Sequence, residues 1–179
     1  WHEKLANQGH FFNAGVARYR FAPAGPDHAQ VASAAGVVDY LEQLHRHHFP
    51  QSPEPSGAGV GSSAAREVHD LLRAREKHLV APLLDWLQAR PDVRIIGKST
   101  AAGRAPTVSF TVANKNPRDM CETLARKNIG TGYGNFYAYR LVEDLGIDPA
   151  VGVLRCSLVH YNTGEEVARL ISALDEILD

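Results

Sequence analysis

A single arginine inside an apolar stretch is the feature of this sequence that most restricts its fold. Residues 152–163 read GVLRCSLVHYNT. β-Branched and apolar residues predominate, and Gly152 and Asn162-Thr163 mark the two ends, so we predict one β-strand over this stretch. The alternation of a strand places Arg155 on one face with Val153, Ser157 and Val159, and leaves Leu154, Cys156, Leu158 and His160 on the other.

The charge of Arg155 has to be compensated, because a buried guanidinium is costly unless an anionic group meets it. Its planar fork of N–H donors suits a carboxylate. Two interpretations stay open at this point. Arg155 forms an internal ion pair with an acid of the chain, or it serves as the receptor for the carboxylate of a substrate.

Composition restricts the class of protein. The chain has 179 residues, with 19 Lys and Arg against 20 Asp and Glu. This balance gives no basic footprint for nucleic acid or an anionic membrane. No apolar run approaches the length of a membrane span, and no signal peptide is visible. Cys121 and Cys156 stand in apolar patterns rather than in a metal or redox spacing, which favours two buried thiols and a cytoplasmic location.

The start of the chain is unusual, because Trp1 stands where an initiator methionine is expected and Met120 is the only methionine. We expect the chain to begin inside a longer gene product, after processing, or as an engineered fragment.

Periodicity and capping signals predict the elements. Asp27 caps a helix that runs to about His48, and a second helix with Pro82 inside it, where we expect a kink or a break, covers 64–89. Asn116 with Pro117 opens a third helix, and Thr163 with Glu166 forms a capping box for the last one, which ends near Leu178. The other predicted elements are strands at 18–21, 93–96 and 106–112, a glycine-rich loop at 130–139 and a short helix at 139–145.

This order predicts an α+β fold: a small, mostly antiparallel sheet with helices packed on one face. Residues 50–63 hold three prolines and three glycines with serines. That composition predicts a flexible surface loop between two helices rather than a domain boundary.

Other chemistry finds little support in the sequence. His45, His47 and His48 lie near the end of the first helix, but no Cys or acidic third ligand stands with them, so we expect no metal. None of the five lysines stands in a buried or otherwise distinctive context, so a Schiff-base lysine is not identifiable.

Several segments together resemble one family. Residues 152–167 are similar to the C-terminal strand and helix of class V aminotransferases, the pyridoxal-phosphate enzymes that include cysteine desulfurases and selenocysteine lyases. Residues 106–110 resemble their preceding core strand, residues 134–138 their active-site loop, and residues 24–28 the turn before the interdomain helix.

The resemblance implies a fold-type-I enzyme of which this chain is the C-terminal part, with residues 1–26 left from the cofactor domain and 27–179 forming the small domain with its interdomain helix. Arg155 would bind the α-carboxylate of an amino-acid substrate. The pocket wall would be formed by Asn135, Phe136, Tyr137 and His160. Gly25 and His28 would lie near the cofactor phosphate across the interface of a homodimer. The lysine that binds pyridoxal 5′-phosphate would lie upstream of Trp1, so we expect the chain alone to bind no cofactor and to be inactive.

Two positions depart from the family pattern. Tyr137 stands where cysteine desulfurases carry a catalytic loop cysteine, and Pro26 stands where the turn usually offers a threonine to the cofactor phosphate. Persulfide chemistry by a loop thiol is therefore not expected, although the family outcome (desulfurase, lyase, epimerase or transaminase) stays open. A non-catalytic binding or dimerisation module that retains the fold is the alternative.

Overall fold

A computed structural model describes residues 4–21, 27–51 and 62–178. The chain divides into two compact units, residues 1–68 and 69–179. Most of the loop predicted at 50–63 lies outside the described residues, as do Gly25 and Pro26. The predicted boundary after residue 26 stays a prediction.

The first unit contains helix α1, His28–His48, which begins as predicted. The Asp27 carboxylate accepts hydrogen bonds from the backbone N–H groups of Ala29 and Gln30 at 3.0 and 3.2 Å. These bonds satisfy two of the donors that a helix leaves free at its first turn. The strand predicted at 18–21 is wrong, because Ala17–Tyr19 form a 3-10 helix closed by the Arg20 N–H on the Ala17 carbonyl.

His45 is the buried residue of α1 in the described part of the chain, and it is 4% exposed. Its Nε2 lies 2.7 Å from Oε2 of Glu67, on the first part of helix α2 (Ser62–Gln88). This contact joins the two helices within the first unit. In the described residues, no group of three or more His, Cys, Asp or Glu side chains could hold a metal ion.

The second unit is built on one sheet of four strands: β1 Val93–Ile96, β2 Thr107–Val112, β3 Gly132–Gly134 and β4 Val153–Ser157. Their spatial order is β1-β2-β4-β3, and every neighbouring pair is antiparallel. Strand β3 lies inside the loop predicted at 130–139. Three residues with two glycines carry too little periodicity to predict a strand.

Helices α2, α3 (Pro117–Arg126) and α5 (Gly164–Leu178) share one hydrophobic core with the sheet. The strands contribute alternate side chains to this core, among them Val108, Phe110, Leu154 and Cys156, all at most 2% exposed. The predicted α+β architecture, with an antiparallel sheet and helices on one face, is confirmed. In the described part of the chain, no helix is long and apolar enough to cross a bilayer.

Helix α2 continues through Pro82, so the predicted alternative of a break there is wrong. Proline removes one N–H from the helical ladder, which weakens a helix from within. Here Leu79, Leu83 and Leu84 on either side of Pro82 are buried in the core. Their packing holds the backbone in the helix despite the missing hydrogen bond.

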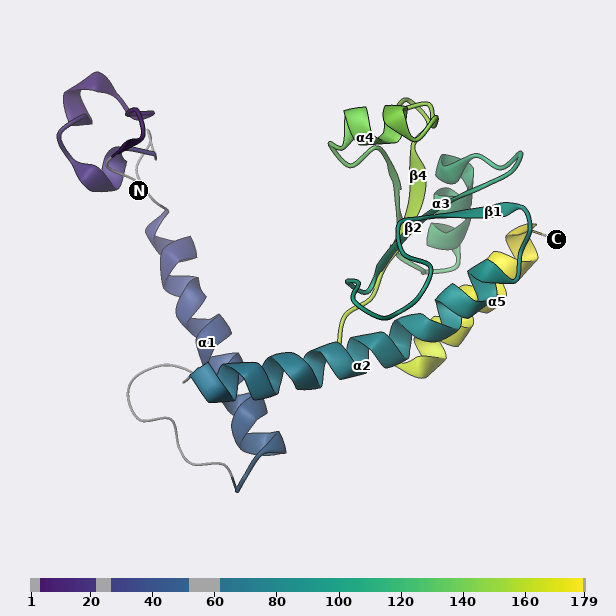
Figure 1. Ribbon diagram of the computed structural model, residues 1–179, viewed down its shortest axis with the longest axis horizontal. Coiled ribbons are helices and arrows are strands. Elements are labelled where there is room, and N and C mark those ends of the chain that lie inside the picture. The colour runs from purple at the N-terminus through teal and green to yellow at the C-terminus, as the bar shows by residue number, and fades with distance from the viewer. Residues whose placement is uncertain (1–3, 22–26, 52–61, 179) are drawn as a thin grey trace. The chain divides into compact units, whose positions relative to one another are not determined.

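Helices α2 and α5 run side by side in the same direction (Figure 1). Near the start of α5, Arg75 donates a hydrogen bond to the Asn162 carbonyl at 2.8 Å. Near its end, Asp175 accepts a hydrogen bond from the Trp86 indole at 3.0 Å and forms an ion pair with Arg90. Two contacts spaced along both helices fix their register.

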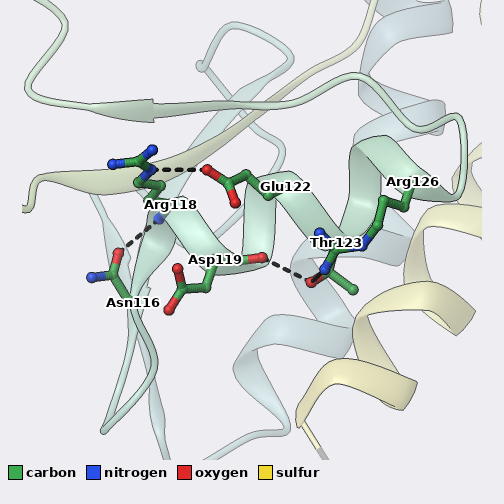
Figure 2. Close-up of polar contacts among 6 residues, drawn as sticks. All are labelled: Asn116, Arg118, Asp119, Glu122, Thr123 and Arg126. Carbon is green, nitrogen blue, oxygen red and sulfur yellow. Dashed lines mark hydrogen bonds and ion pairs between the residues drawn. The ribbon is translucent and has the colours of Figure 1, made fainter.

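Figure 2 shows the first turns of α3, which begin as predicted. The Asn116 side chain accepts a hydrogen bond from the Arg118 N–H at 2.9 Å, and Arg118 Nε lies 2.8 Å from Oε1 of Glu122 one turn on. This polar edge faces solvent, whereas Met120 and Leu124 are buried. The two faces orient α3 on the sheet.

Strand β4 is shorter than predicted and ends at Ser157. The Asn162 side chain accepts a hydrogen bond from the Val159 N–H at 2.8 Å, which folds residues 159–162 into a turn. The predicted capping box follows: Glu166 accepts from the Thr163 N–H, and Thr163 Oγ1 accepts from the Glu166 N–H. Hydrogen bonds from Asn162 and from Thr163 lower the pKa of Glu166.

Candidate functional site

Arg155 lies in the middle of the sheet, on the face away from the three core helices. Its neighbours on β4, Leu154 and Cys156, point into the core, so alternation turns Arg155 to the opposite face. The register pairs it with Ser109 on β2 and with Gly132 on β3. A small hydroxyl residue and a glycine therefore flank the arginine on this face.

The same face is bordered by helix α4, Tyr139–Asp144. Arg94 of β1 shares this face, because its neighbours Val93 and Ile95 pack against the core. Its Nη1 donates a hydrogen bond to the Leu145 carbonyl at the end of α4, at 2.9 Å. This hydrogen bond attaches the end of α4 to the edge strand of the sheet.

Phe136 lies directly against the Arg155 guanidinium. The guanidinium carbon is 3.6 Å from the centroid of the Phe136 ring, which is a close cation–π contact. Gly132 makes this position possible, because a Cβ atom there would lie 3.1 Å from Cε1 of Phe136. The arginine, the ring and the glycine therefore form one packed group on the sheet face.

The turn that carries Phe136 has an unusual backbone. Phe136 and Tyr137 have φ angles of 50° and 63°, in the left-handed region that non-glycine residues rarely adopt. Asn135 holds this turn: its Oδ1 accepts from the Tyr137 N–H at 3.0 Å and its Nδ2 donates to the Pro149 carbonyl at 3.1 Å.

Arg155 forms no internal ion pair with the residues that the structure describes. Within these ranges, its half-buried guanidinium has no carboxylate within 4.0 Å and no hydrogen-bond acceptor, and it packs on the Phe136 ring. Of the two interpretations that the sequence left open, the internal ion pair is therefore not observed among these residues. No acceptor among the described residues therefore competes with a ligand for the N–H groups of this guanidinium.

The other predicted site residues have different positions. His160 lies in the turn after β4, so the prediction that it shares a strand with Arg155 is wrong. Its ring packs edge-on against Tyr161, with centroids 5.2 Å apart. The Tyr137 side chain is fully exposed. His28 is the exposed first residue of α1 in the other unit, and Gly25 is outside the described residues.

Sequence reasoning did not identify Ser109 and Gly132 as parts of the site. Ser109 lies in a correctly predicted strand, and Gly132 in the loop where β3 forms. Their positions beside Arg155 depend on the pairing register, which a single sequence does not specify. The one signal in the sequence was an alternating strand with a serine on its polar face.

The two cysteines are free thiols that are wholly or partly buried. Cys156 is 2% exposed, and burial, with a smaller contribution from Cys121, raises the pKa of its thiol to about 12. Cys121 is half-buried, and its thiol lies 3.4 Å from the Thr131 carbonyl. The chemistry of Cys156 is that of an inert core thiol rather than of a nucleophile.

The chain belongs to the class-V aminotransferase family. The model of this family, described as aminotransferase class-V, matches residues 65–170, which include most of α2, the whole sheet and the Arg155 group. The predicted resemblance to class V aminotransferases and cysteine desulfurases is confirmed.

Individual relatives carry related descriptions. An aminotransferase-like protein, FGM3, of Gibberella zeae is 32% identical over 98% of this chain and 40% of its own length. A probable cysteine desulfurase of Xylella fastidiosa is 33% identical over 71% of this chain and 31% of its own length. The apo structure of a cysteine desulfurase from Thermococcus onnurineus NA1 covers 89% of this chain and 33% of that chain, with a TM-score of 0.66 and 22% identity, a likeness of fold. The chain thus spans about a third to two fifths of the length of these relatives.

The five lysines of the chain do not fit the role of a lysine that forms an imine with a cofactor. Lys4, Lys77, Lys98 and Lys115 are exposed, and Lys127 forms an ion pair with Glu176. An imine-forming amine is normally desolvated or placed beside another cation. None of the five lysines has such an environment, whereas the Arg155 group fits a carboxylate.

Proposed function

We propose that this chain is the C-terminal part of a pyridoxal-phosphate-dependent enzyme, and that Arg155 binds the α-carboxylate of its amino-acid substrate. The observation that carries the proposal is the Arg155 guanidinium, which packs against Phe136 on the sheet face away from the core, without a carboxylate partner among the described residues. A guanidinium without an anionic partner binds a ligand carboxylate favourably, because the two carboxylate oxygens can accept two parallel N–H hydrogen bonds.

In the full-length protein that contains this chain, the cofactor and the residues of this chain have different roles. Pyridoxal phosphate, held by residues outside this chain, supplies the chemistry. This chain binds and orients the substrate: Arg155 meets the carboxylate, Phe136 excludes water from one side of the guanidinium, and Asn135 shapes the turn that carries the ring.

The remaining assignments rest on the family. Tyr137 and His160 would complete the wall of the substrate pocket. Gly25 and His28 would lie near the cofactor phosphate across the interface of a cytoplasmic homodimer. By itself the chain is expected to form no imine with the cofactor and to be inactive.

The experiment that tests the proposal replaces Arg155 in the full-length protein that contains this chain. Arg155→Ala should weaken amino-acid binding by about 2–4 kcal/mol, the contribution of a bidentate charged contact. Arg155→Lys should restore part of this affinity, because it keeps the charge and loses the fork. Arg118→Ala, on the exposed side of α3, is the matched control and should leave binding unchanged.

Unchanged amino-acid affinity in the Arg155→Ala variant would contradict the proposal. That outcome would favour a binding or dimerisation module that retains the fold without the chemistry.

A further inference from the structure

We infer that Phe136 is a positioning residue that sets the plane of the Arg155 guanidinium for a carboxylate. The inference rests on the proposed function of Arg155 and deepens it. It starts from the 3.6 Å distance between the guanidinium carbon and the centroid of the Phe136 ring.

A ring at this distance covers one face of the guanidinium and leaves its edges uncovered. The five N–H donors of an arginine lie in the plane of the guanidinium and point outward from its edge. Contact with a ring face therefore does not compete with a carboxylate, which approaches in that plane. Phe136 restricts the guanidinium to orientations parallel to one surface, and this restriction defines the direction from which a carboxylate can be bound.

Gly132 restricts the position of the Phe136 ring. Gly132 lies against the ring edge, since a Cβ atom there would lie 3.1 and 3.2 Å from two ring carbons. Gly132 is also the residue paired with Arg155 across β3 and β4. The same pair of strands thus places both the arginine and the surface against which the ring packs.

The backbone at Phe136 is held in a costly conformation. The φ angles of 50° at Phe136 and 63° at Tyr137 each cost of the order of 1–2 kcal/mol in a non-glycine residue. The two hydrogen bonds of Asn135 hold this conformation. An unfavourable conformation persists where the surroundings over-determine it, and such positions concentrate at binding sites. At this position, the conformation brings the Phe136 ring over Arg155.

Positioning by Phe136 predicts a specific energetic effect. An arginine side chain loses much rotamer freedom when it binds a ligand. Stacking on the ring removes part of that freedom before binding. The loss of the ring should weaken amino-acid binding about 2- to 12-fold, the effect of immobilising one rotamer-rich side chain only on binding. A ligand without a carboxylate should not be affected.

The direct test uses the full 179-residue chain and NMR of its arginine Nε–Hε groups, with no ligand. The Arg155 signal is identified by its absence from the Arg155→Lys variant. In the unaltered chain we expect this signal to be shifted by the ring current of Phe136 and to show restricted motion. Phe136→Leu should remove both properties, whereas Tyr137→Leu, the neighbouring exposed aromatic, should preserve them.

Two variants that keep an aromatic ring at position 136 distinguish loss of the ring from unfolding of the leucine variant. Phe136→Tyr should behave as the unaltered chain, and Phe136→Trp should keep or increase the shift, because indole is the strongest cation–π partner. An Arg155 signal that is the same in the Phe, Tyr and Trp forms and also in the leucine form would overturn the inference. So would an Arg155 side chain as mobile in the unaltered chain as in the leucine variant.

Binding measurements distinguish the positioning role of Phe136 from the proposed carboxylate-binding role of Arg155. In the full-length protein, Phe136→Leu should raise the Kd of L-alanine about 2- to 12-fold and leave that of L-alaninamide unchanged. If Arg155→Ala weakens L-alanine binding and Phe136→Leu does not, the positioning role fails and the proposed function stands. If Arg155→Ala has no effect, the proposed function itself fails, whatever the NMR result.

Discussion

Gly152 lies so close to Gly134 that no other residue fits at its position. A Cβ atom on Gly152 would lie 2.2 Å from the carbonyl carbon of Gly134, and the φ angle of Gly152 is +72°. Gly134 ends β3 and Gly152 directly precedes β4. This approach of two backbones brings the loop that carries Phe136 to the strand that carries Arg155.

Gly152→Ala should therefore destabilise the chain by about 2–5 kcal/mol, because it combines a left-handed backbone with overpacking. Urea unfolding measures the effect. Gly164→Ala is the matched control. Gly164 begins α5, its φ is not positive, and a Cβ atom added to it would have no other atom within 4 Å, so its replacement should be neutral or mildly stabilising. Equal stabilities of the two variants would contradict the assigned role of Gly152.

Burial of Cys156 predicts a loss of stability at alkaline pH. Its pKa is raised from 9.0 to about 12 in the folded chain, so the folded state keeps a proton that the unfolded state releases. The contribution to stability is complete below about pH 9 and is lost as pH rises toward 12. The slope approaches about 1.4 kcal/mol per pH unit within this window.

The measurement compares urea unfolding at pH 8 and pH 10 for the unaltered chain and for Cys156→Ala. The variant should be less stable at pH 8 because of the cavity, and should lose less stability than the unaltered chain between the two pH values. A native Cys156 that reacts rapidly with a thiol reagent at pH 8 would contradict its assignment as an inert core residue.

The lowered pKa of Asp175 predicts a loss of stability at acid pH. The hydrogen bond from Arg90, and then that from Trp86, lowers the pKa of the Asp175 carboxyl. Its contribution to stability is therefore present above its ordinary pKa of 3.8 and is lost as pH falls through the lowered value. Asp175→Asn should be less stable than the unaltered chain at neutral pH, and this difference should narrow as the pH falls below 4. A constant difference down to acid pH would mean that the ion pair does not hold α5 on the residues that follow α2.

The elements set by local signals were predictable, and those set by pairing were not. The caps at Asp27, Asn116 and Thr163 placed three helix starts, because a cap is a side chain bonded to backbone two or three residues away. Strand β3 depends on its pairing with β4, which is distant in the sequence. The position of Arg155 on a strand was predictable from its apolar neighbours, yet its contact with Phe136 depends on the register of β3 and β4.

The prediction of a strand reaching to His160 failed for a local reason. Val159 belongs to an apolar pattern that continues the strand, but Asn162 accepts the Val159 N–H and turns the chain. Asparagine side chains commonly stabilise turns by bonding to nearby backbone groups. Asn162 was interpreted as the end of the strand, but its side chain closes a turn that already begins at Val159.

The most direct test of the central claim measures the coupling between Arg155 and the carboxylate of the ligand. The Kd values of L-alanine and L-alaninamide are measured for the full-length protein and for its Arg155→Ala variant, in one thermodynamic cycle. We predict a coupling of about 2 kcal/mol or more, with the amino acid losing affinity in the variant and the amide nearly unaffected. A coupling near zero, with both ligands affected equally or neither affected, would contradict the assignment of Arg155 as the carboxylate receptor.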